Sequence, residues 1–199
     1  MTFLKNNFQN ILKLYINQIG IMIFSLALMF PLESIGGDEG AKPIWSILAS
    51  ILSVLFYYVL LYYAVWEIGA KDKIRIDSGR YEPTPARGVL LGLFANIPNL
   101  ILSLPLFVLT AINVFTGACS NAVAVFNLIF RLHCSMYLGT VLGMTGFNND
   151  PNDPIQILVA ALFVVVPLIS AGVTHLAYWL GSHESKLLSF LSRNKRTDK

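Results

Sequence analysis

The chain alternates long apolar runs with short polar segments, and this pattern predicts membrane-spanning helices. Apolar residues recur at helical spacing through residues 11–32, and uncharged apolar runs follow at 43–66, 89–112 and 155–180. A hydrocarbon layer of about 30 Å needs about 20 helical residues, so each run is long enough to cross it. No linker or internal repeat divides the chain, so residues 1–199 form a single predicted helical membrane domain.

The first run follows Lys5 and Lys13, which is also the charge pattern of a signal peptide. The helical apolar pattern begins at Phe3, well before the most apolar part of the run. This early start favours a retained span over a cleaved segment.

The uncharged run 88–130 is too long for one crossing, because a helix of that length would rise about 65 Å. Gly117 and several polar residues between positions 113 and 121 predict a turn within it. A further helical segment, 121–144, follows this turn.

Positive charge is concentrated in two places. Ten of the fourteen Lys and Arg residues lie in Lys71–Arg87 and Lys186–Lys199. Cationic segments beside spans remain on the cytoplasmic side, so the loop 67–87 and the basic tail 181–199 are predicted to be cytoplasmic, together with the amino terminus. The acidic residues interspersed in the loop indicate a solvated segment more than a lipid clamp.

Arg131 decides how segment 121–144 is placed. If this segment spans, the number of crossings is odd and the basic tail lies outside, against the charge rule. An arginine at the centre of a span also costs about 2.5–3.5 kcal/mol on insertion scales. The predicted fold is therefore an all-α, polytopic integral membrane helical bundle with four transmembrane helices plus one interfacial or re-entrant helix; the alternative is five transmembrane helices.

Composition supports this class. Hydrophobic residues make up 55% of the chain and charged residues 13%, with a mean hydropathy of +0.64. The formal charge of +3 flanks apolar runs and forms no basic patch, so no nucleic acid partner is expected. The partners expected are the lipid bilayer and either a second copy in a homo-oligomer or a membrane-complex partner. The absence of a glycosylation sequon fits a multi-pass protein of a bacterial cell membrane with both termini cytoplasmic.

The third run carries a polar face. Asn96, Asn99 and Ser103 share one side of a helix, and Pro98 and Pro105 each remove a backbone donor nearby. Such a face can line a polar pathway, because prolines free carbonyl groups that amides can satisfy. The alternative is that these side chains join neighbouring helices.

Segment 121–144 carries a second polar stripe, formed by Asn127, Arg131 and Ser135 at four-residue spacing, with His133 nearby. Arg131 and His133 are candidate contacts for a lipid head group. The histidines lack metal-ligand spacing, and the acidic loop at 148–153 is typical of a turn and helix cap. Cys119 and Cys134 are expected to be unpaired thiols. No catalytic, cofactor or metal site is predicted.

Two functions fit these features. The first, which the sequence favours over an enzyme, is a small transport-related or membrane-assembly component. The second is a lipid-modifying membrane enzyme in which Arg131 holds an anionic head group and either His133 or Glu67 transfers a proton, although the topology places Glu67 at the opposite interface from Arg131. The enzyme requires Arg131, His133 and a carboxylate to converge at one cavity.

Overall fold

The computed structural model describes residues 2–35, 42–80, 82, 84, 86–144, 150 and 152–183. Within these ranges the ordered elements are all helical, which confirms the all-α class. The predicted basic tail beyond residue 183 lies outside the described residues. In chain order the elements are α1 (Thr2–Ile35), α2 (Lys42–Asp77), α3 (Arg87–Ala95), α4 (Ile97–Thr116), α5 (Ser120–His133), the 3-10 turn η1 (Ser135–Tyr137), α6 (Leu138–Met144) and α7 (Ile155–Ser182).

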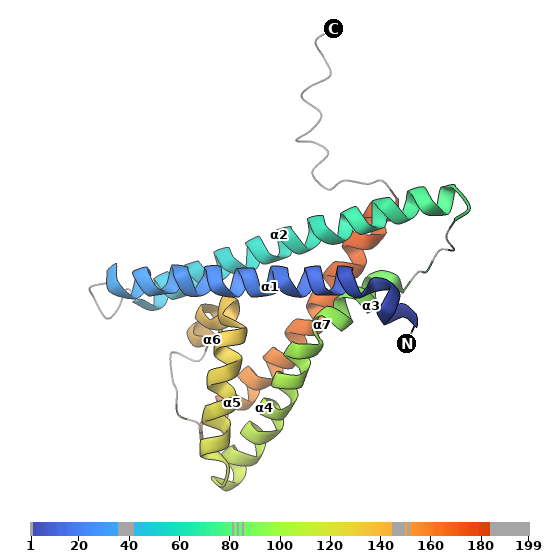
Figure 1. Ribbon diagram of the computed structural model, residues 1–199. Coiled ribbons are helices and arrows are strands. Elements are labelled where there is room, and N and C mark those ends of the chain that lie inside the picture. The colour runs from blue at the N-terminus through green and yellow to red at the C-terminus, as the bar shows by residue number, and fades with distance from the viewer. Residues whose placement is uncertain are drawn as a thin grey trace.

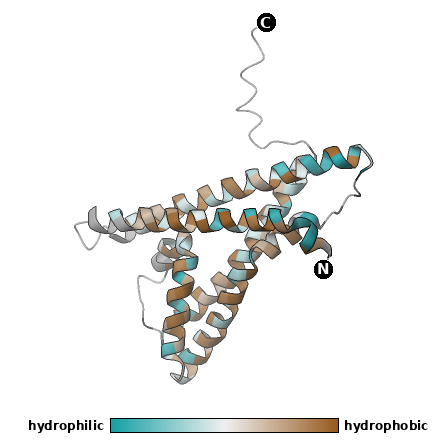
Figure 2. Cartoon of the chain, viewed as in Figure 1, coloured by the Kyte–Doolittle hydropathy of each residue, from teal (hydrophilic) through white to brown (hydrophobic). Residues whose placement is uncertain are grey.

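Four of the described helices, α1, α2, α4 and α7, are long and apolar enough to cross a membrane. Segment α5 passes the same test only when joined to η1 and α6, and the two parts are bent by 91°. The predicted count of four or five spans is therefore confirmed, and the fifth segment is no straight helix. Figure 2 shows hydrophobic colour along α4, α5 and α7, with hydrophilic colour gathered where α2 ends.

The helices form two groups. In Figure 1, α1 and α2 lie side by side across the upper part of the molecule. Helices α4 and α5 descend from this pair and meet at the turn between them, while α7 packs on α2, α3 and α4. Gly117 ends α4 with a φ of 68°, a left-handed conformation that favours glycine, so the predicted turn lies where expected.

Helix α2 continues about ten residues beyond the predicted end of its span, into the segment expected to be a loop. Its 36 residues give a length of about 54 Å. Glu67 and Lys71 form an i,i+4 ion pair at 2.7 Å, which stabilises the extension. The extension also has a buried face, because Asp72 is only 1% exposed. The alternating charges predicted a solvated segment, and this prediction fails at Asp72, whose side chain points into the protein.

Close helix packing depends on glycines. Gly88 and Gly92 of α3 face α7, where an added Cβ at Gly88 would lie 2.8 Å from the Cα of His175 and one at Gly92 would overlap the hydroxyl of Thr174. Gly139 of α6 faces the backbone of Ser46 in α2 in the same way. These are small-xxx-small motifs, which let helix backbones approach within a membrane.

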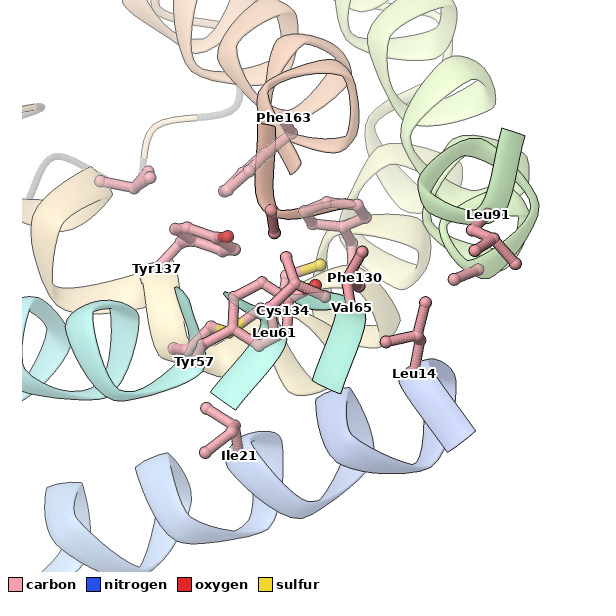
Figure 3. Packing of buried hydrophobic residues seen from close by; sticks show 14 of the residues in the cluster. Leu14, Ile21, Tyr57, Leu61, Val65, Leu91, Phe130, Cys134, Tyr137 and Phe163 are labelled. Carbon is pink, nitrogen blue, oxygen red and sulfur yellow. The ribbon is translucent and has the colours of Figure 1, made fainter. Parts of the chain in front are cut away.

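The apolar core lies where the two groups of helices meet. Figure 3 shows side chains from α1, α2, α3, α5, η1 and α7 converging there. Phe130 of α5 and Phe163 of α7 pack with ring centroids 4.4 Å apart. Because this core joins α5 to α7, it fixes the walls of the cleft described next.

Candidate functional site

A cleft opens between α4, α5 and α7. Its volume is about 340 Å³. Apolar side chains form most of its walls, and four polar side chains interrupt them. The residues that matter most are Thr110, Asn127, Leu128, Arg131, Gln156 and Phe163.

Of the described residues that line this cleft, only Arg131 is charged. Its Nε donates a hydrogen bond of 2.8 Å to Oδ1 of Asn127, one helical turn earlier. Thr110 and Gln156 contribute polar groups from the neighbouring helices, and both are buried. Asn127 and Arg131 of the predicted polar stripe therefore face a cavity between helices, whereas Ser135 lies in η1 and is not part of the lining.

His133 belongs to a different surface. It lies two residues after Arg131, and two helical residues are separated by about 200° around the axis. Its ring lies 6.0 Å from the ring of Tyr15 in α1. Its Nε2 is buried with no hydrogen-bond partner among the described residues. The structure does not bring the two predicted head-group contacts together.

The predicted polar face at the start of α4 is a hydrogen-bonded chain. Gln18 of α1 donates to Oδ1 of Asn99 at 2.9 Å, and Asn99 donates to Oδ1 of Asn96 at 2.8 Å. Asn96 in turn donates to the carbonyl of Gly92 at 2.9 Å. Asn96 also lies between the end of α3 and the start of α4, so this series of hydrogen bonds lies at a break between two helices. Ser103 is fully buried further along α4 and donates weakly to Leu100, at 3.5 Å.

The second helix break, at Cys134, meets the first. The Sγ of Cys134 lies 3.9 Å from Oδ1 of Asn99. Ser135 donates to the carbonyl of Met22 at 3.0 Å, which ties the break to α1. Ser50 of α2 donates to the carbonyl of Met136 at 2.6 Å. Ser50 thus satisfies a backbone carbonyl at the 91° bend, and the Ser135 side chain ties the bend to α1.

A buried ion pair joins four helices at the charged end of α2. Nη1 of Arg87 lies 2.9 Å from Oδ2 of Asp72, and its Nη2 donates to Oδ1 of Asn7 at 2.8 Å. The hydroxyl of Tyr178 donates to the same Asp72 oxygen at 3.0 Å. Both charged residues were expected to be solvated. One available signal was periodicity, because Asp72 follows the buried Val65 by two helical turns.

The remaining polar candidates are structural. Oδ1 of Asp153 accepts a hydrogen bond of 2.9 Å from the N–H of Ile155 and so caps α7, as predicted for a turn and cap. Both cysteines are free thiols. No group of three His, Cys, Asp or Glu side chains that could hold a metal occurs within the described ranges.

Comparison with known proteins finds no match. No protein-family model, no curated protein and no solved structure matches the chain.

The cleft has a small set of polar groups. It offers one guanidinium, two amides and a hydroxyl on otherwise apolar walls. A proton-transfer mechanism needs an acid or base within reach of the reacting group. Among the described residues no carboxylate or histidine lines the cleft, so the convergence that the enzyme hypothesis requires is not present.

Proposed function

We propose that the chain is a small, non-catalytic component of a membrane transport or membrane-assembly system, which binds a partly polar molecule in the cleft between α4, α5 and α7. The observation that carries this proposal is the cleft itself, with Arg131, Asn127 and Gln156 on apolar walls. A concave, largely apolar cavity with a few convergent polar groups is the usual form of a ligand site.

The two helix breaks support the same function. Interrupted helices at membrane depth occur in transporters, where they bring backbone and polar side chains to a binding region. Here the breaks at Asn96 and Cys134 meet around Asn99, at the ends of two of the three helices that wall the cleft. The 91° bend after α5 turns this helix away from η1 and α6.

The rest of the molecule forms a frame. The ion pair between Asp72 and Arg87 and the hydrogen bonds of Gln18 and Ser50 each connect helices that are distant in sequence. Buried polar networks that are satisfied make a structure more rigid. A rigid frame around the cleft suits a component that holds its ligand for a partner protein.

Photocrosslinking at two leucines of equal exposure tests this proposal. Leu128 lines the cleft and is 62% exposed, whereas Leu55 is 60% exposed and lines a separate, wholly apolar hollow between α1 and α2. A benzophenone amino acid is introduced at either position, and native membranes are irradiated. We expect the Leu128→benzoylphenylalanine variant to form a discrete adduct with one bound molecule that the protein has not modified. The Leu55 variant should form adducts with the bulk lipids of the membrane. Identical adducts at both positions would refute a specific binding role.

A further inference from the structure

Resting on the proposed function, we propose that the ligand of the cleft is an anionic membrane lipid, whose phosphate or carboxylate binds Arg131 and whose acyl chain lies along the apolar walls. The first support is charge. The lining contains one positive side chain and no negative one among the described residues. A net-negative head group gains an ion pair there, whereas the ammonium of a zwitterionic head group finds no carboxylate.

The orientation of Arg131 is the second support. Asn127 binds its Nε and fixes the plane of the guanidinium. A guanidinium has five donors in a planar fork that matches phosphate and carboxylate oxygens. Gln156 and Thr110 also line the cleft, so their amide and hydroxyl groups can hydrogen-bond the ester or hydroxyl oxygens of a head group.

The apolar walls of the cleft supply the site for the acyl chain of the lipid. Leu128 lines the cleft and is also exposed at the outer surface of α5, so the apolar lining continues onto the surface that faces lipid. Phe163 and Leu106 form the inner wall. A volume of about 340 Å³ is near the lower end of ligand pockets, about 300–1,000 Å³. The cleft therefore holds a head group and the first part of one chain, while the remainder lies in the bilayer.

Competition between lipids in nanodiscs measures this preference. The full chain is placed in nanodiscs of phosphatidylcholine and phosphatidylglycerol in equal amounts, and the lipid retained after release is quantified by native mass spectrometry. We expect about tenfold enrichment of phosphatidylglycerol, which corresponds to about 1.4 kcal/mol, because the charged contact with Arg131 favours the anionic head group. Arg131→Gln should abolish the enrichment and Arg131→Lys should retain part of it.

Two variants complete the experiment. Arg75→Gln removes an exposed cation of α2 that lies outside the cleft, and it should leave the enrichment unchanged. Leu128→Trp fills the cleft with a larger side chain from an exposed position, so it should abolish the enrichment even though Arg131 is retained. This variant tests the lipid assignment if Arg131→Gln fails to fold.

Three outcomes would overturn the lipid assignment. These are equal retention of both lipids, enrichment that survives Arg131→Gln and Leu128→Trp, and Arg131-dependent thermal stabilisation by inorganic phosphate in nanodiscs of phosphatidylcholine alone. If the discrete adduct at Leu128 persists in any of these cases, the binding function stands and only the ligand class fails. If the adduct is absent as well, both proposals fail.

Discussion

Asp72 and Arg87 are both almost completely buried, at 1% and 5% exposure, and each depends on the other for its charge. Removing one partner of a buried ion pair leaves an uncompensated charge and costs about 3–5 kcal/mol. We expect Asp72→Asn to lower the midpoint of thermal unfolding, measured by fluorescence-detected size exclusion in detergent. Replacement of both residues, Asp72→Leu with Arg87→Met, should recover most of the loss.

Glu67 provides the matched control for this prediction. It is also an acidic residue of α2 with cationic neighbours, but its side chain is half exposed. Surface ion pairs contribute about 0–1 kcal/mol. Glu67→Gln should therefore leave the unfolding midpoint nearly unchanged, and an equal shift for Glu67→Gln and Asp72→Asn would show that burial is not the cause.

Single residues also show what the sequence could and could not reveal. Helical periodicity placed Asn96 and Asn99 on one face, and they do contact each other. Gln18, which binds Asn99, is 81 positions away, and no local pattern indicates such a partner. Arg131 could be identified as unusual from its apolar surroundings, but its separation from His133 depends on the tertiary packing of α5.

At the scale of elements, the crossing of α3 and α7 depends on a glycine at position 92. An added methyl group would overlap Thr174 and lie 2.7 Å from the Cα of Ala171, so the helices must separate. We expect Gly92→Ala to destabilise the protein by about 1–3 kcal/mol, a typical cost of overpacking. Thermal unfolding measures the effect, and Gly92→Ala combined with Thr174→Ala, which removes the overlapping hydroxyl, should not restore stability, because the Cα of Ala171 remains in the way.

Gly20 is the control for this substitution. It lies within α1, and an added Cβ there meets no atom within 4 Å. Alanine is a better helix former than glycine by about 1 kcal/mol. Gly20→Ala should therefore preserve or raise the unfolding midpoint, and a comparable loss in both variants would contradict the packing explanation.

The helices themselves were largely predictable, because apolar runs and the glycine turn mark them directly. Their ends were less so. Helix α2 overruns its predicted end because ion pairs and the burial of Asp72 extend it, which hydropathy does not detect. The sequence favoured a segment 121–144 that does not span straight, and its 91° bend agrees. The position of that bend depends on Ser50 and on the carbonyl of Met136, which are 86 residues apart.

For the whole molecule, the even number of crossings predicts the side on which each end lies. Ser78, just after α2, and His183, just after α7, should both face the cytoplasm, and Ala118, in the turn between α4 and α5, should face the opposite side. All three are exposed. Cysteine is placed at each position singly in a Cys119→Ser background, and intact cells are labelled with a membrane-impermeant maleimide.

Only the Ala118→Cys variant should react before permeabilisation. Ser78→Cys and His183→Cys should react afterwards, because four crossings return the chain to its starting side. Labelling of His183→Cys together with Ala118→Cys in intact cells would mean that segment α5–α6 crosses the membrane, and the five-span alternative would then hold.

Helix α2 carries two of the contacts described above at opposite ends. Ser50 supports the bend at η1, and Asp72, 22 residues later, anchors the ion pair at the other end, about 33 Å away. No break interrupts the helix between them. A tilt of the charged end of α2 would therefore also displace the contact beneath η1, because the helix between the two contacts is continuous.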